Sequence, residues 1–469
     1  EVRLNHLQRA IGLRQAVALN MIEMVGVGPF ITIPLILQAM GGPQAMLGWI
    51  LGAAFALCDG LIWAELGAAL PGAGGTYHYL GVMYKGGWGR LFAFLFVWQT
   101  IFSGPLVIAS GCIGLALYAS FLWPGLDQPL FALGSWISFS PATAVAMGCC
   151  LLALLLAYRQ VRWIARLGEW LWVGVAATIA WVIFAGVTHF HAARAFDFPP
   201  HALQLSSGFF LGLGSAMVIA FYDYGGYETS NYLGAEVLRP EKTLPRAVLI
   251  SVALVGFVYV VMNISLLGVV PWRELVGGAA HNYVVSELMR RVYGMAAARL
   301  VTVLILWTAF ASVFALLLGL SRVLYAAAAD GNFFRAFARL HPRGGFPTVA
   351  LLALGLASVF FCLFRLDEVI AALIAIRIVS QYLLQAVGLL VWRRRHPEAP
   401  RPYRMPLYPL PALLAIAGFM FLLLAPAGAL RELAYGTLVL ASGVLVYFWR
   451  ASSGRDRGAG GPAGRTTAA

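Results

Sequence analysis

The sequence predicts an all-α protein that crosses a membrane many times. Of its 469 residues, 61% are hydrophobic and only 11% are charged, whereas a soluble domain carries about 25% charged residues. The mean hydropathy is +0.83. The apolar residues also gather into runs near the ~20 residues that a helix needs to cross the hydrocarbon of a bilayer. Most of the surface is therefore expected to face lipid, in a polytopic membrane protein.

Twelve apolar segments have the length of a membrane span. Some exceed 20 residues, which implies tilt or extension beyond the bilayer. The segments are residues 16–38, 45–70, 90–121, 141–158, 167–188, 207–233, 245–270, 298–326, 347–364, 367–392, 406–426 and 429–450. Twelve crossings place both ends of the chain on one side of the membrane.

The basic residues indicate which side that is. Twenty-four of the 32 Lys and Arg residues fall at the N-terminus, in every second loop and in the tail, and seven fall on the opposite side. Loops rich in Lys and Arg stay in the cytoplasm, so we expect both termini to be cytoplasmic in a protein of the plasma membrane. The net charge of +13 is thereby explained by topology and does not indicate nucleic-acid binding. Residues 451–469 have the composition of a disordered tail.

The first span is interrupted by residues that a helix disfavours. Gly26, Gly28 and Pro29 lie close together in its middle, and Glu23 lies one turn before them. Glycine costs a helix about 1 kcal/mol and proline about 3 kcal/mol relative to alanine. We expect two half-helices joined by unwound backbone at residues 26–29. Such backbone survives in a membrane only when it is buried in protein or lines a watery cavity, so this break is a candidate binding site.

The sixth span has a similar interruption. Gly225 and Gly226 lie at its centre, between the carboxylates of Asp223 and Glu228. Five spans separate this break from the first, and an odd number of spans inverts the second unit relative to the first. The pattern is typical of two five-helix inverted repeats with paired broken helices. The repeats would cover residues 16–188 and 207–392, followed by two extra helices at 406–450, in one domain of residues 1–450.

Charged residues within the spans are expensive and usually functional. For Glu23 and Asp223 we weigh a role toward a ligand's ammonium group, or a proton, against simple hydrogen bonding to backbone. For Glu228 we favour coupling or gating. Arg377 lies inside a span and should have an acidic partner, which the sequence does not identify. For Glu65 and Arg322, near helix ends, we expect capping or snorkelling ahead of a gating ion pair.

Three further motifs resemble the amino acid–polyamine–organocation (APC) superfamily of permeases. Residues 64–80 contain A-E-L-G, then Pro71, then G-G-T-Y-H-Y-L. Residues 235–247 read A-E-V-L-R-P-E-K-T-L-P-R-A, and residues 321–331 begin with S-R and end with A-D-G. The G-V-G of residues 26–28 fits the family's G-x-G, and all of these occur in the family's order.

This resemblance implies a LeuT-like fold of twelve helices that transports amino acids or amines by alternating access. It implies that the backbone of Gly26, Val27 and Gly28 binds the substrate carboxylate. It also implies that carbonyls at Tyr222, Asp223, Tyr224 and Gly225 receive the amino group. Many proton-coupled members carry a lysine in the fifth span. The aligned positions here are Gly174 or Val175, so coupling through that lysine is not expected.

Several function classes are left open or excluded. The main hypothesis is an amino acid transporter, a symporter or an exchanger, with protons as the coupling ion through Glu228 or Glu23. Ser312 is the one hydroxyl that we weigh for a sodium site. The alternatives are a carrier of polyamines or cationic amines and a non-transporting membrane sensor. We find no metal-ligand cluster, nucleophile elbow or phosphate loop, so we expect neither enzyme activity nor a cofactor. Substrate identity and oligomeric state stay open.

Overall fold

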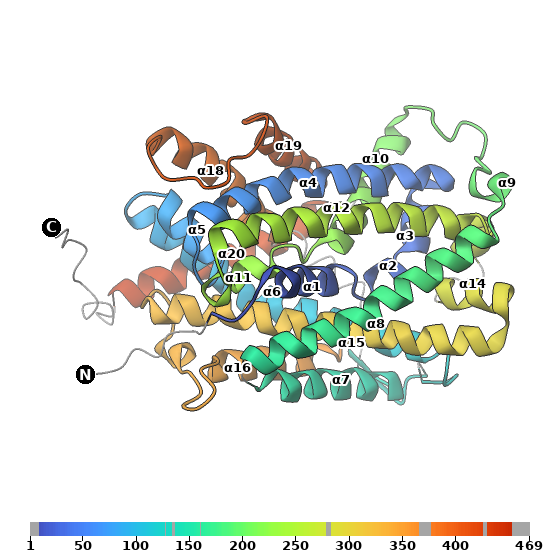
Figure 1. Cartoon of the computed structure of the whole chain (residues 1–469), viewed down its shortest axis with the longest axis horizontal. Helices are drawn as coiled ribbons and strands as arrows, with labels where there is room; N and C mark the ends of the chain where they lie inside the picture. The colour runs from blue at the N-terminus through green and yellow to red at the C-terminus, as the bar shows by residue number, and fades with distance from the viewer. Residues whose placement is uncertain are drawn as a thin grey trace.

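The computed structural model describes residues 9–126, 128–133, 137–159, 161–277, 283–364, 377–424 and 429–452. Long helices run side by side along one axis and form a single bundle (Figure 1). The start of α1 and the end of α20 lie toward the same end of that bundle, together with α5 and α18. The predicted tail falls outside the described residues from position 453 on, and the predicted tenth span does so up to position 376.

The helices follow the predicted spans closely in sequence. Those of the first half are α1 (Leu13–Met24), α2 (Gly28–Ile31), α3 (Ile33–Met40), α4 (Met46–Ala69), α5 (Thr76–Met83), α6 (Gly87–Ala119), α7 (Pro141–Ala157), α8 (Val161–Thr188) and α9 (Ala192–Ala195). The next are α10 (Ser207–Tyr224), α11 (Thr229–Tyr232), α12 (Pro240–Leu267), α13 (Trp272–Gly277), α14 (Val284–Tyr293) and α15 (Met295–Ala329). The last are α16 (Thr348–Phe361), α18 (Leu384–Arg395), α19 (Leu410–Leu424) and α20 (Ala429–Ser452).

Shorter helical segments complete the chain. Three are 3₁₀ turns: η1 (Pro43–Ala45), η2 (Gly234–Glu236) and η3 (Arg335–Ala338). The fourth, η4 (Ile378–Leu383), is π-helical. π-Helical turns are rare and often mark functional sites. This one leads directly into α18.

The apolar helices confirm a polytopic membrane protein. Among the described residues, six helices are long and apolar enough to span a bilayer, or seven when the bent first span is included. Helices α7, α16 and α19 are apolar but shorter. The twelve-span count remains a prediction, because several of its segments are divided into shorter helices. One difference from all-α is a small antiparallel hairpin between α6 and α7, where β1 (Phe131–Leu133) pairs with β2 (Ile137–Phe139).

Four long helices form the frame around the centre of the bundle. Helix α4 packs along α12, and α6 packs along α15. Helix α1 contacts α8, α12 and α15, so the interrupted first span is enclosed by protein. All five cysteines are free thiols, and four of them are buried, as expected for thiols in apolar segments.

Candidate functional site

The first break lies slightly upstream of its predicted position. Helix α1 ends at Met24, and residues 25–27 are non-helical. Gly28 and Pro29, which we expected in the unwound stretch, form the first turn of α2 instead. The reason is that proline fits the first turn of a helix, where its missing N–H would have no acceptor in any case. A second interruption follows at Thr32, where the axis bends by 58° into α3.

The sixth span is interrupted at the two predicted glycines. Helix α10 ends at Tyr224, and α11 begins at Thr229 after four turn residues. Gly226 has a φ of 121°, and its Cα lies against the first span: a Cβ there would stand 2.8 Å from Met24 N. Only glycine adopts that φ without strain. The break therefore depends on both the backbone conformation and the close approach of α1.

Replacing Gly226 with alanine should destabilise the protein. A non-glycine residue in this conformation costs about 1–3 kcal/mol, and the new methyl group would also press on Glu23 Cβ, at 2.9 Å. The measurement is the melting temperature of the purified protein. Gly81→Ala in α5 is the matched control, because a Cβ at Gly81 meets nothing within 4 Å. Equal melting temperatures for the two variants would contradict the prediction.

Hydrogen bonds hold the two breaks face to face. Thr229 Oγ1 donates to Glu23 Oε2, and Ser230 N donates to Asn20 Oδ1 at 2.8 Å. Tyr259 OH of α12 reaches carbonyls at the ends of both broken helices: Met24 O, of the last residue of α1, at 2.5 Å, and Asp223 O, one residue before the end of α10, at 3.3 Å. The bonds from Ser230 N and to Met24 O and Asp223 O satisfy backbone groups near the interruptions.

Backbone hydrogen bonds also join the segment just before α1 to the segment at the end of η2. Ala10 N and Ile11 N both donate to Glu236 O, at 2.8 and 3.0 Å. In return, Leu238 N donates to Ile11 O at 2.8 Å. The residues just before α1 therefore form a short parallel bridge with the residues just after η2.

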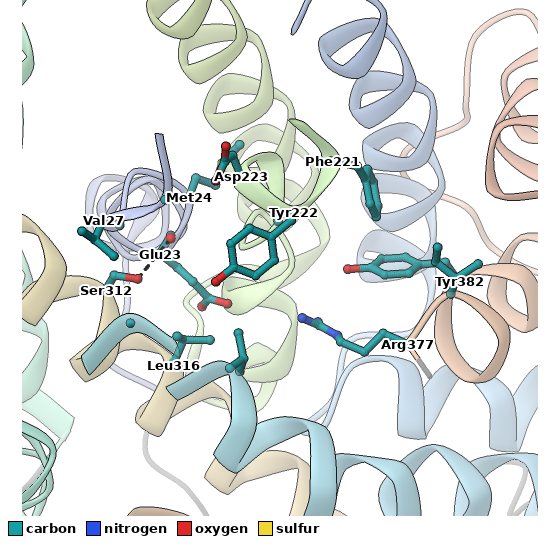
Figure 2. Close-up of a pocket in the computed structure, with 16 residues that line it drawn as sticks. Glu23, Met24, Val27, Phe221, Tyr222, Asp223, Ser312, Leu316, Arg377 and Tyr382 are labelled. Carbon is teal, nitrogen blue, oxygen red and sulfur yellow. Dashed lines mark hydrogen bonds between the residues drawn. The ribbon is translucent and has the colours of Figure 1, made fainter. Parts of the chain in front are cut away.

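A cavity of about 80 Å³ lies between the two breaks (Figure 2). One water needs only about 10–15 Å³ of such space, so the cavity has room for several. The lining residues come from five parts of the chain: Glu23, Met24, Gly26, Val27, Gly28, Val107, Gly111, Phe221, Tyr222, Asp223, Gly225, Ser312, Leu316, Arg377, Ile378 and Tyr382.

Seven of the predicted site residues line this cavity, and two do not. Those at the cavity are Glu23, Gly26, Val27, Gly28, Tyr222, Asp223 and Gly225. The side chain of Tyr224 packs elsewhere, because its hydroxyl donates to Trp49 O at 3.1 Å and its ring packs edge-on to that of Trp49. Glu228 is fully buried beside the cavity rather than in its wall.

Glu228 is the acidic partner of Arg377 that the sequence did not identify. Arg377 Nη2 lies 2.8 Å from Glu228 Oε1, and the same oxygen accepts from Tyr382 OH at 3.1 Å. The other oxygen of Glu228 accepts from Gly226 N at 3.0 Å. The carboxylate thus joins the break after α10 to the segment around η4.

Only one of the two carboxylate oxygens of Asp223 has a hydrogen-bond partner among the described residues. Its Oδ2 accepts from Thr32 Oγ1 at 2.5 Å. Its Oδ1 is buried without a hydrogen-bond partner among the described residues, and it lies against the Cα of Gly28. A buried polar atom without a partner costs free energy, so this oxygen at the cavity wall is suited to a bound donor.

Sequence reasoning missed part of the lining. Arg377 was noted as an unusual residue but not placed at the site, and Tyr382, Leu316 and Val107 gave no signal at all. Ser312 was considered only for sodium; its Oγ donates to Glu23 O at 3.3 Å and also lies close to Gly26. These residues come from α6, from α15, and from η4 with the residue just before it, and only the tertiary fold brings these segments to the breaks.

Two ion pairs correct the expectation of capping or snorkelling. Glu65 is fully buried and accepts from Arg393 and from Met405 N. Arg322 is paired with Glu236, and both side chains are only 1% exposed. A snorkelling arginine keeps its charged group in water, whereas this guanidinium is enclosed and needs its carboxylate.

Comparison with known proteins agrees with the motifs in the sequence. A family model described as amino acid permease matches residues 11–449. The serine/threonine exchanger SteT of Bacillus subtilis is 27% identical over 89% of this chain and 91% of its own length. The large neutral amino acids transporter small subunit 2 of Rattus norvegicus is 28% identical, over 94% of this chain and 80% of its own. The branched-chain amino acid permease BcaP of Lactococcus lactis is 26% identical, over 89% of each. These relatives are transport proteins rather than enzymes, and the chain belongs to the amino acid permease family.

Proposed function

We propose that this protein is a secondary active transporter that moves amino acids across the plasma membrane by alternating access. The observation that carries the proposal is one cavity whose wall includes residues of both helix breaks. Broken helices that meet inside a bundle are a recurring design for substrate sites in transporters. The amino acid transporters and exchangers among its relatives support the same substrate class.

The substrate's charged groups would bind at the two breaks. In this proposal the backbone of Gly26, Val27 and Gly28 receives the carboxylate. The carbonyls of Tyr222 to Gly225 receive the ammonium group, which does not require the side chain of Tyr224. The unpartnered Oδ1 of Asp223 adds a second acceptor for that ammonium group.

The same proposal includes twelve spans in two inverted repeats of five, with both ends of the chain in the cytoplasm. The described helices fall within or close to all twelve predicted segments. The first and sixth segments, which the repeat makes equivalent, are both interrupted. The excess of Lys and Arg in alternate loops supports the orientation.

Replacing Gly28 with leucine should abolish uptake of amino acids into proteoliposomes. A Cβ at Gly28 would overlap Asp223 Oδ1, and the rest of the side chain would fill the space next to both breaks. Gly26→Leu should act similarly, because its Cβ would stand 2.7 Å from Ser312 Oγ. Gly148→Leu is the matched control, since this glycine lies exposed on α7 with nothing within 4 Å of a Cβ. Normal uptake by both folded cavity variants would contradict the proposed site.

Protons are the proposed coupling ion, with exchange of one amino acid for another as the alternative mode. A carboxylate in a low-dielectric site can load a proton near neutral pH, and Glu23 lines the cavity. The fifth span offers no cation at Gly174, which lies against the indole of Trp307.

A carrier of cationic amines is the second candidate function, favoured by the carboxylates Glu23 and Asp223 in the cavity wall. Arg377 in the same wall disfavours a cation.

A further inference from the structure

We infer that Glu23 and Arg377 form a subsite for the substrate's side chain, which selects an uncharged group that both donates and accepts hydrogen bonds. A carboxamide or a hydroxyl group has this chemistry. The inference rests on the proposed amino acid transport, and it makes Arg377 a specificity-determining residue.

The two charged side chains enter the cavity from opposite directions. Figure 2 shows the carboxylate of Glu23 and the guanidinium of Arg377 pointing toward one another across the cavity. Glu23 comes from the last turn of α1, and Arg377 stands directly before η4. Both line the cavity, and no ion pair joins them within the part of the chain that the structure describes. A space between opposite charges is therefore open to a ligand.

Each side chain has unused hydrogen-bonding capacity toward that space. Arg377 uses Nη2 for Glu228 and Nε for Gln381 Oε1, at 2.8 and 3.3 Å. Its Nη1 has no hydrogen bond to any described residue. Glu23 accepts from Thr229 through Oε2, and its Oε1 likewise has no described partner. The subsite thus offers one donor group and one acceptor oxygen, held in place by their other contacts.

The substrate's carboxylate and ammonium groups are proposed to bind elsewhere in the cavity, so the subsite of Glu23 and Arg377 is available to the substrate's side chain. The G-x-G backbone and Asp223 are the proposed partners of the substrate's carboxylate and ammonium groups. Figure 2 shows Asp223 beside Met24, farther from Arg377 than Glu23 and Tyr222 are. A substrate anchored at the breaks would then direct its side chain toward Glu23, Arg377 and the hydroxyl of Tyr222, which is held by Ser110 Oγ at 2.9 Å.

Charge and solvation decide which side chain fits. An apolar side chain would displace water from Glu23 and Arg377 without replacing its hydrogen bonds, and buried polar groups left unpaired strongly disfavour binding. A cationic side chain would be attracted by Glu23 and repelled by Arg377. An anionic side chain would be attracted by Arg377 and repelled by Glu23. An uncharged group with a donor and an acceptor satisfies both residues without leaving a net charge.

Pairs of amino acids with similar shape test the inference. Threonine and valine differ mainly in one hydroxyl group, and glutamine and methionine are both unbranched and similar in length. The dissociation constant of each is measured from the rise in melting temperature of the purified protein with ligand concentration. We expect threonine and glutamine to bind at least about 10-fold more tightly than their partners. A smaller preference, or tighter binding of lysine or glutamate than of glutamine, would overturn the inference. Failure of all twenty amino acids to stabilise the protein would contradict the proposed function itself.

Variants of Arg377 separate recognition from folding. Arg377→Lys can keep the charge pair with Glu228 but lacks the second terminal nitrogen. The double variant Arg377→Met with Glu228→Gln removes both charges and so avoids an unpaired buried charge. In each variant, the preference for threonine over valine should fall to about 3-fold or less. Without the Arg377 donor group, binding of valine no longer leaves that buried group unpaired. The matched control is Arg273→Met with Asp197→Asn, an exposed ion pair, which should keep the parent's preference. A preference that persists in both Arg377 variants would overturn the inference.

Discussion

Replacing Arg322 with methionine should lower the free energy of unfolding by about 3–5 kcal/mol. Arg322 Nε lies 2.8 Å from Glu236 Oε1, and both side chains are 1% exposed. The guanidinium also donates to Ser321 Oγ at 3.2 Å and to Leu318 O. Removing it would leave the carboxylate of Glu236 buried without its counter-charge, and that loss is larger than the net contribution of the pair itself.

Two comparisons isolate this effect, with unfolding followed in mixed micelles of detergent and dodecyl sulfate. The double variant Arg322→Met with Glu236→Gln should recover most of the loss, because no unpaired charge remains. Arg273→Met is the surface control. Its partner Asp197 is 44% exposed, so the change should be at most about 1 kcal/mol. If Arg322→Met and Arg273→Met are equally stable, the buried pair does not have the expected importance.

Concentrative uptake should follow an imposed proton gradient and ignore sodium. An inward gradient of about two pH units supplies about 2.7 kcal/mol per proton, which is enough for about 100-fold accumulation of substrate. The assay uses proteoliposomes with the pH gradient and the sodium gradient imposed separately. Strict dependence on sodium with no response to pH would rule out proton coupling.

Glu23→Gln distinguishes the roles of that residue in the same assay. If Glu23 carries the coupled proton, the variant should lose accumulation driven by the pH gradient while exchange of internal for external amino acid persists. If Glu23 instead receives a second ammonium group, affinity for lysine, arginine or polyamines should fall, and neutral amino acids should be unaffected. Glu287→Gln is the control, since this carboxylate pairs with Arg290 and Arg291 away from the cavity. A Glu23 variant that matches the parent in both respects would exclude both proton coupling and the binding of a second ammonium group as roles of Glu23.

The helix breaks could be predicted because their causes are local. Glycine and proline disfavour a helix wherever they occur, and two interruptions five spans apart predicted where the cavity lies. The same reasoning misplaced Gly28 and Pro29 by a few residues. Proline disrupts the interior of a helix, but it is also favoured in the first turn of a new helix. The sequence alone does not say which of these two effects decides its position.

The charged partners could not be predicted, because they depend on contacts between distant segments. Glu228 and Arg377 are 149 residues apart in the chain, and nothing near either residue specifies the other. Tyr224 shows the same limit on a smaller scale. A helix turns about 100° per residue, so Tyr222 faces the cavity while Tyr224 packs on Trp49. Because the sequence does not fix the residue at which the break starts, it does not show which of Tyr222 and Tyr224 faces the cavity.

The parallel bridge between Ile11 and Val237 has a mechanical consequence. It joins the outer ends of two half-helices whose inner ends already meet through Glu23 and Thr229. Linked at both ends, α1 and the α11–η2 segment are expected to swing as one lever, with residues 25–27 and 225–228 as its hinges. A rearrangement that begins at one hinge is then expected to move the other half-helix as well.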